Sequence, residues 1–283
     1  MLFIGVCCTE YDFDKNLRGL AESITSIKKA FSNEVFIFGV IQKKESSKFS
    51  PSSIILKSIF NEYIITHEFG VSCSRNKIIE KALFYKDSFG INSLLFHDSS
   101  IRWNDRASNF IFANRKKPVY VKFKYCKNHE NKAYRIALQK KDDRFETINI
   151  LTNTYVGSYL LDINSIKDIR FNENFGPGEK TEYKSGEDVL FLNAYFNRNG
   201  IKKIKTCPST FLFHPSRPTD YSKHLLYAKG QGRVFRLLLT EHFNYYYLYR
   251  FALFLSNGLL RCILCKKNSF TILKERLIGF LKG

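Results

Sequence analysis

Two continuous apolar runs near the N-terminus constrain the fold more than any other feature of this sequence. They are "LFIGVCC" (2–8) and "VFIFGVI" (35–41). Neither run alternates between apolar and polar residues, so each is predicted to be a strand buried on both faces of a sheet. Between them, apolar residues recur at helical spacing from Leu17 to Phe31. Strands of this kind belong to parallel sheets whose faces are covered by helices.

The same alternation continues along the first half of the chain. A shorter strand is expected at 62–67, and "SLLFHD" (93–98) reads as a further buried strand. Between these two, the apolar spacing around Ile78 predicts a helix, with Ser72 or Ser74 as its N-cap. The order of strands and helices predicts an α/β fold with a mixed, mostly parallel sheet flanked by helices.

The second half is expected to contain more strand. Residues 118–125 alternate with period two, which is typical of a strand with one exposed face. The segment 146–162 is rich in strand-forming residues, and a later strand is expected to end at His214. Before that strand, a short helix is predicted to stop at Gly200.

Composition limits the class of protein. The chain has 283 residues and 44% hydrophobic residues, enough for one large folded domain with or without an appendage. Its seven cysteines are an odd number without framework spacing, which favours reduced thiols in a cytosolic protein. The first residues lack the basic region and cleavage site of a signal peptide, so we expect a core strand there. The net charge of +19 favours a polyanionic ligand, an anionic membrane or nucleic acid.

The positive charge is concentrated at the C-terminal end. Residues 223–283 hold eleven Lys and Arg against two acidic residues, a net charge of +9. The longest uncharged run there, Phe251–Leu260, has ten residues, whereas a membrane-spanning helix needs about 20. A basic amphipathic stretch of this kind is expected to lie on a membrane surface. We therefore predict two parts, a domain of residues 1–222 and a basic helical tail of residues 223–283.

Four polar clusters follow expected strands or open expected helices. In an open parallel sheet, ligands bind beyond the carboxyl ends of the strands, so these clusters are candidates for one shared site. The clusters are Thr9-Glu10-Tyr11, Ser74-Arg75-Asn76, Asp98-Ser99-Ser100, and Glu187-Asp188 after a glycine-bearing loop.

The order and spacing of these clusters resemble the family 2 glycosyltransferases, which have the GT-A fold, over roughly residues 1–220. "GVSCSRNKIIEKA" resembles the family's "G-x-x-x-A-R-N-x-G-I-x-x-A" helix start, and "LLFHDSS" stands where the family has a strand and a D-x-D motif. "IRFNENFGPGEKTEYKSGEDVLF" resembles the acceptor-side loop "F-D-E-x-F-G-x-G…G-E-D", and "FLFHP" resembles a late histidine-bearing strand.

The resemblance implies a role for each cluster. Asp188 is the expected catalytic base, with Glu187 as the neighbour that shapes its field. The nucleotide-sugar donor is expected to bind among six residues: Thr9, Glu10, Arg75, Asn76, Asp98 and Ser100. If a divalent metal such as Mn²⁺ or Mg²⁺ takes part, Asp98 and His214 are its expected ligands.

The sequence departs from the family pattern in two places. Ser100 replaces the second aspartate of the D-x-D motif, and Gln42 stands where an acidic residue often follows the second strand. A serine hydroxyl is a poor ligand for a hard cation, so metal dependence is expected to be weaker than in relatives with both carboxylates. Without a metal, the charge of the leaving group falls to Arg75 and to basic loop residues such as Arg217 or Lys223.

Some of these residues also have a purely structural explanation. "SGED" is close to a capping box in which Ser185 caps the helix that contains Asp188. Arg75 could be a solvated residue in the first turn of its helix, although a cation there opposes the helix dipole. Asp98 could be a turn residue at a strand end.

The combined interpretation is a cytoplasmic glycosyltransferase at the inner face of the membrane. The family implies an inverting transfer to a saccharide or lipid-linked acceptor in bacterial surface polysaccharide biosynthesis. Two alternatives remain, a non-catalytic relative that serves as scaffold or partner subunit, and a basic nucleic-acid-binding protein. No RRM, KH or zinc-knuckle signature is present, so we expect no nucleic-acid partner.

Overall fold

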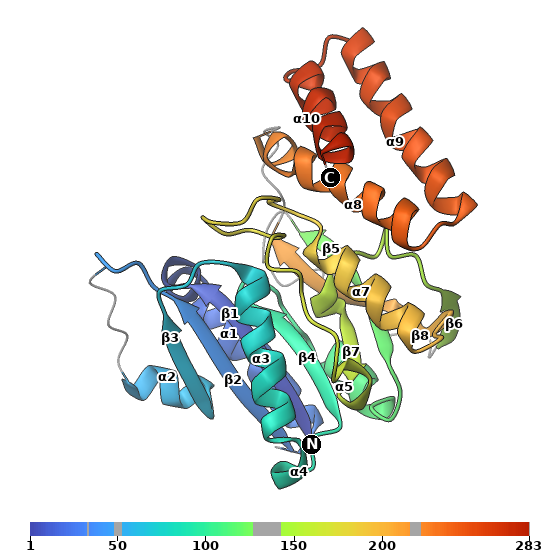
Figure 1. Ribbon diagram of the computed structural model, residues 1–283. Helices are drawn as coiled ribbons and strands as arrows, with labels where there is room; N and C mark the ends of the chain where they lie inside the picture. The colour runs from blue at the N-terminus through green and yellow to red at the C-terminus, as the bar shows by residue number, and fades with distance from the viewer. Residues whose placement is uncertain (33, 48–52, 127–142, 216–221, 283) are drawn as a thin grey trace.

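A computed structural model describes residues 1–32, 34–47, 53–126, 143–215 and 222–282 of the chain. Over these residues the protein is a mixed α/β fold built on one eight-stranded sheet (Figure 1). The strands are β1 (Leu2–Thr9), β2 (Val35–Gln42), β3 (Glu62–Thr66), β4 (Ser93–Asp98), β5 (Val119–Cys126), β6 (Arg144–Thr147), β7 (Tyr159–Asp162) and β8 (Lys203–Pro215).

The sheet has a parallel half and a mixed half. Its order is β3-β2-β1-β4-β7-β5-β8-β6. The first four strands are parallel neighbours, with β1 between β2 and β4. Strand β7 pairs antiparallel with both β4 and β5, and β6 is an antiparallel edge strand beside β8. The predicted mostly parallel sheet is therefore confirmed, and the carboxyl ends of β1, β2 and β4 lie together at one edge.

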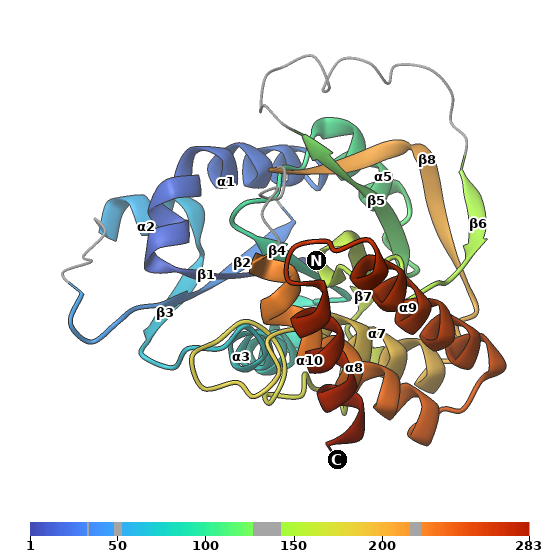
Figure 2. The same cartoon turned by 90° about the horizontal axis from the view of Figure 1, so that it is seen from above.

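Helices cover both faces of this sheet, as the buried apolar runs require. Helices α1 and α5 lie on one face, and α3 and α7 lie on the other (Figure 2). The helices of this domain are α1 (Glu10–Ala30), α2 (Ser53–Ile59), α3 (Val71–Phe84), α4 (Lys86–Phe89), α5 (Asp105–Ala113) and α7 (Glu187–Arg198), with short 3-10 turns at Val156–Ser158 and Asn164–Ile166.

The close approach of α3 to β1 depends on one glycine. A Cβ added at Gly5 would lie 2.0 Å from the Ile78 side chain. Ile78 and Ile79 of α3 are both fully buried in the core on this side of the sheet. The missing side chain at Gly5 thus allows the first turns of α3 to sit close to the ends of β1 and β4.

Two of the sequence predictions need correction in detail. Helix α3 begins at Val71 with Gly70 as N-cap, and no side chain caps it. Ser72 and Ser74 lie inside the helix, both buried. The segment predicted to be rich in strand, 146–162, contains only the end of β6 and the four residues of β7, because most of it forms turns before the Val156–Ser158 turn.

The C-terminal residues form three helices, α8 (Ser222–Glu241), α9 (Tyr245–Ile263) and α10 (Ser269–Leu281). Helix α8 is part of the main core, since Val234 and Leu238 are buried in the same cluster as α3 and α7. Helices α8 and α10 cross closely at two glycines. A Cβ at Gly232 would lie 1.9 Å from the carbonyl oxygen of Arg276, and one at Gly279 would meet an α8 carbonyl at the same distance. No helix in the described part of the chain combines the length and apolar character needed to cross a bilayer.

Candidate active site

The candidate site is built at the carboxyl ends of β1, β2 and β4. Thr9 at the end of β1 pairs with Gln42 at the end of β2, and Cys7 pairs with Asp98, the last residue of β4. Side chains alternate along a strand, so Asp98 faces the same side as Phe96, whose ring packs in the core beneath α3 and α7. His97 faces the opposite side and is buried at 1% exposure.

Arg75, in the second turn of α3, is the centre of the cluster. Its side chain is only 3% exposed and lies near three carboxylates. The Nη1 atom is 2.5 Å from Asp188 Oδ1 and 3.6 Å from Glu187 Oε1. The Nη2 atom is 3.9 Å from Asp98 Oδ1, and the guanidinium also packs over the ring of Phe171. The structure therefore brings together four of the candidate residues, Arg75, Asp98, Glu187 and Asp188.

Asp188 uses both oxygens of its carboxylate. Oδ1 accepts a hydrogen bond from Arg75, and Oδ2 accepts one from the backbone N–H of Val156 at 3.1 Å. Glu187 and Asp188 are the first two residues of α7, where the helix dipole favours negative charge. The predicted cap by Ser185 is wrong. Gly186 is the N-cap with a φ of 107°, and the Ser185 hydroxyl donates instead to the carbonyl of Tyr227 in α8.

Three carboxylates around one buried cation leave an excess of negative charge. Burial, followed by repulsion from Asp188, raises the pKa of Glu187 to about 7, and Arg75 opposes that rise. Burial also raises the pKa of Asp188, again against the attraction of Arg75. A carboxyl group whose pKa lies near neutrality is suited to proton transfer. Burial likewise raises the pKa of the neighbouring Cys7 thiol to about 12. The thiol is therefore protonated at neutral pH and adds no charge to the site.

The side-chain amide of Asn76 has a structural role. Its Oδ1 accepts from the backbone N–H of Phe171, and its Nδ2 donates to the Phe171 carbonyl and to Glu173. The amide thereby fastens the segment that carries Phe171 against α3. Gln42 has a similar role, since its Nε2 donates to Ser74 Oγ at 2.6 Å and to the Gly70 carbonyl.

Thr9 and Glu10 lie at the start of α1, beside the ends of β1 and β2. Thr9 is the N-cap of α1. Its hydroxyl accepts from the Asp12 backbone N–H and donates to the Asp12 carboxylate. Glu10 is different, because its Oε2 is buried without a hydrogen-bond partner in the described structure. A carboxylate oxygen in that state is ready to accept a hydrogen bond from a ligand.

The predicted metal ligands do not form a ready metal site. Ser100 lies in the turn after β4, which is closed by the Ile101 backbone N–H on the Asp98 carbonyl. His214, near the end of β8, packs its ring against Phe123. Among the residues that the structure describes, no group of three His, Cys, Asp or Glu side chains could hold a metal ion. With Ser100 neutral and Arg75 as its neighbouring charge, Asp98 alone does not fit a divalent cation held by the protein. Arg217 lies outside the described residues.

Two further residues of the site escaped the sequence analysis. Tyr155 has a buried hydroxyl beside the Asp98 carboxylate. Burial, with the negative charge of Asp98 as the next cause, raises its pKa well above the usual value. Arg102 donates to the carbonyls of Ser99 and Ile101 and so supports the turn after β4. Neither residue belongs to a local sequence pattern that would reveal these contacts.

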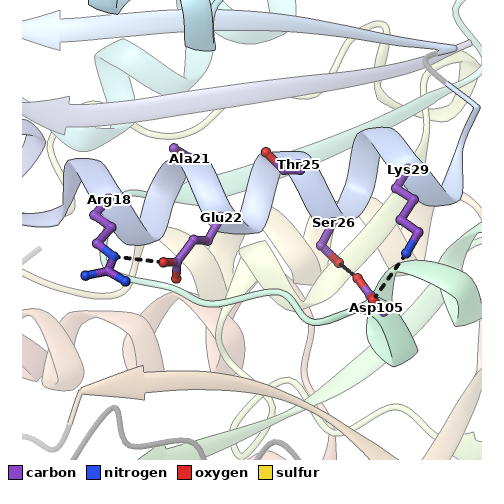
Figure 3. A pocket seen from close by; sticks show the side chains of 7 residues that line it. All are labelled: Arg18, Ala21, Glu22, Thr25, Ser26, Lys29 and Asp105. Carbon is purple, nitrogen blue, oxygen red and sulfur yellow. Dashed lines mark hydrogen bonds and ion pairs between the residues drawn. The ribbon is translucent and has the colours of Figure 1, made fainter.

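A separate pocket lies away from this cluster, along the outer side of α1 (Figure 3). Its lining contains an ion pair between Arg18 and Glu22, and Asp105 accepts a hydrogen bond from Ser26 and pairs with Lys29. These charged groups satisfy one another at the surface, and none of the predicted site residues lines the pocket.

Comparisons with known proteins show which solved structures have a similar fold. No family model matches the chain, and no curated protein matches its sequence. Solved structures do match. S. aureus TarS 1–349 in complex with UDP-GlcNAc aligns over 84% of this chain and 66% of that chain, at 16% identity and a TM-score of 0.54. GalNAc-T7 with UDP, GalNAc and Mn²⁺ aligns over 88% and 50%, at 11% identity and a TM-score of 0.54.

The architecture is therefore that of the GT-A glycosyltransferases, as both neighbours and the strand order indicate. Against the whole of S. aureus TarS the chain spans 40% of that protein's length, at 18% identity and a TM-score of 0.53. The chain thus shares a fold with these enzymes over most of its own length and covers only part of theirs.

Proposed function

We propose that this protein is a glycosyltransferase that moves a sugar from a nucleotide-sugar donor to an acceptor hydroxyl. The observation that carries the proposal is the cluster of Arg75 with Asp98, Glu187 and Asp188 at the carboxyl ends of the parallel strands. In α/β sheets of this kind, ligands bind at that edge. The binding of UDP-GlcNAc by TarS and of UDP by GalNAc-T7 supports a nucleotide sugar as the donor.

In this proposal Asp188 is the general base. The acceptor oxygen attacks the anomeric carbon, the bond from that carbon to the phosphate oxygen breaks, and the acceptor proton passes to the Asp188 carboxylate. A single displacement of this type inverts the anomeric centre. Glu187 lies beside Asp188 and carries a pKa of about 7, so it can hold a proton next to the base and limit the negative charge in the site.

Arg75 links donor binding to the base. In the described structure its Nη1 atom lies 2.5 Å from Asp188 Oδ1. The oxygen that would take the proton is therefore already paired with Arg75. The donor's phosphates carry more negative charge than one carboxylate and compete for the same guanidinium. Arg75 would then stabilise the leaving phosphate and release Asp188 for the acceptor hydroxyl. The base is thereby freed only when a donor is present.

Thr9, Glu10, Asn76, Asp98 and Ser100 complete the proposed donor side. Glu10, with its unpartnered oxygen, and Asp98, with a side chain 31% exposed, can accept hydrogen bonds from sugar or ribose hydroxyls. Asn76 and Thr9 act by holding the surrounding backbone, as their hydrogen bonds indicate. Ser100 offers a neutral hydroxyl in the turn after Asp98.

The proposed setting is bacterial surface polysaccharide biosynthesis at the cytoplasmic face of the membrane. The family resemblance supports a saccharide or lipid-linked acceptor. The net charge of +9 over residues 223–283 supports a peripheral association with anionic lipid. Both statements concern the partners of the reaction and are independent of which nucleotide carries the sugar.

A panel of donors tests the catalytic proposal. Purified protein is incubated with UDP-, GDP-, CMP- and TDP-sugars, with and without Mn²⁺, and nucleotide release and binding heat are measured. We expect one donor class to bind and to be slowly hydrolysed. Asp98→Asn should weaken that binding, whereas Arg18→Gln, at a fully exposed arginine on the outer side of α1, should not. Absence of binding and release across the whole panel would leave the protein as a non-catalytic relative.

A further inference from the structure

Helix α9 has an apolar face that nothing in the described chain covers. Large apolar side chains along its outer side are exposed at helical spacing, and the most exposed are Tyr245 at 80% and Ile263 at 77%. We call this surface the outer α9 face. It comprises Tyr245, Tyr249, Leu253, Leu259, Leu260 and Ile263. Ser256 and Asn257 are exposed polar residues on the same helix.

The opposite side of α9 already provides the contacts that hold the helix in place. Phe251 stacks on Phe280 of α10 at 4.3 Å between ring centroids, and Gly258 lies against Leu273. At the start of the helix, the Tyr247 hydroxyl bonds to Asn193 of α7. Helix α9 is therefore fastened by its inner side, and its outer apolar face is not needed for packing within the described chain.

The turn between α9 and α10 adds positive charge to this surface. Lys266 and Lys267 are exposed there, four and three residues before Phe270, whose side chain is 74% exposed. Residues 242–283 contain seven Lys and Arg and one acidic residue, Glu275, a net charge of +6. In Figure 1 this turn lies at the end of the molecule remote from the sheet, so the sheet and its flanking helices do not cover it.

Charge complementarity indicates which partner binds the outer α9 face. Two copies of this chain meeting through their outer α9 faces would bring like charges together, which opposes association. An anionic bilayer offers an apolar layer for the leucines and tyrosines and negative headgroups for the lysines. Aromatic side chains such as Tyr245 and Tyr249 favour the boundary between these two layers.

We propose that the outer α9 face, together with Lys266, Lys267 and Phe270, inserts into the headgroup and acyl boundary of an anionic lipid bilayer. Helices of this type lie in the plane of the interface with their apolar face buried about 5–10 Å. The inference deepens the proposed peripheral association. The inference rests on the proposed function in one respect: membrane insertion would hold the site near a lipid-linked acceptor. It differs from attraction by charge alone, because apolar insertion persists when salt screens the lysines.

Flotation of the full chain with vesicles tests this proposal without any sugar nucleotide. The vesicles contain phosphatidylcholine with or without phosphatidylglycerol. We expect binding to the anionic vesicles that high salt reduces but does not abolish. The double variant Leu260→Ser with Ile263→Ser should lower the partition coefficient about 10- to 100-fold, because two largely exposed side chains lose their burial in lipid.

The matched control is Phe84→Ser, which removes an aromatic side chain of similar exposure, 73%, from α3. It should bind vesicles as the wild type does, and thermal melting should show that both variants remain folded. Unchanged binding by the folded double variant would overturn the proposal, as would complete release of the wild type by salt. A wild-type dimer in light scattering that the double variant converts to a monomer would assign the face to self-association. None of these outcomes depends on the donor panel.

Discussion

Replacing Glu187 by glutamine should stabilise the protein, and the gain should grow with pH. The side chain is 12% exposed, lies 3.6 Å from Arg75 and is next to the carboxylate of Asp188. Glutamine keeps the size of glutamate and its ability to accept a hydrogen bond, but it never ionises. The substitution therefore isolates the free energy of ionising this one buried group.

The magnitude follows from the pKa of Glu187, which burial and Asp188 raise from 4.5 to about 7. Because the native carboxyl group binds its proton more tightly than the unfolded one, the wild type loses stability as pH rises through this window. Each pKa unit corresponds to about 1.4 kcal/mol, so the full difference is about 3 kcal/mol. Glu187→Gln should match the wild type below about pH 4.5 and exceed it by up to about 3 kcal/mol above about pH 7.

Urea unfolding followed by circular dichroism at several pH values measures this difference. The matched control is Glu22→Gln, because Glu22 is an exposed glutamate that pairs with Arg18 on the surface. An exposed ion pair contributes about 0–1 kcal/mol, so the control should show little change with pH. If Glu187→Gln were less stable than the wild type near about pH 8, or if its effect did not vary with pH, Glu187 would be an ordinary ionised residue and the reasoning would fail.

Three more changes test the site and the helix packing. Asp188→Asn should lower sugar transfer about 10²–10⁴-fold without weakening donor binding. Steady-state kinetics with near wild-type turnover would move the base to Glu187. Treatment with EDTA should leave part of the transfer activity, and calorimetry should show that Ser100→Asp binds Mn²⁺ more tightly than the wild type. Stoichiometric tight Mn²⁺ binding by the wild type alone would contradict this view. Gly232→Val should cost about 1–3 kcal/mol in thermal unfolding, since a Cβ there meets the Arg276 carbonyl at 1.9 Å; an unchanged melting temperature would refute the close helix crossing.

Local patterns were sufficient to predict the parallel half of the sheet. The runs at 2–8 and 35–41 became β1 and β2, and the apolar strand before Asp98 became β4. These predictions hold because a strand buried on both faces must be apolar throughout, whatever surrounds it. Helix ends were less predictable. Ser185 has the residue type of a cap, but its hydroxyl bonds to α8 and Gly186 takes the position instead.

The basic tail, residues 223–283, also shows a difference between what local patterns predict and what tertiary contacts decide. Its basic and amphipathic character is visible in the sequence, where Phe270 and Leu273 have the spacing of one helical face. In the structure Leu273 is buried against α9, whereas Phe270 is exposed. Periodicity identifies an apolar face but does not say whether protein, lipid or water lies against it. That α8 belongs to the main core also depends on contacts between distant segments.

Local spacing along the chain specifies the alternation of strands and helices and the residue types at the sheet edge. Which of those residues meet depends on how the helices and strands pack. Arg75 and Asp188 are 113 positions apart, and their contact depends on α3 and α7 covering the same face of the sheet. Asn76, adjacent to Arg75 in the chain, turns instead to the backbone at Phe171. The physical reason is that secondary structure follows from local spacing, whereas a charged cluster requires segments remote in sequence to be packed together before its members can interact.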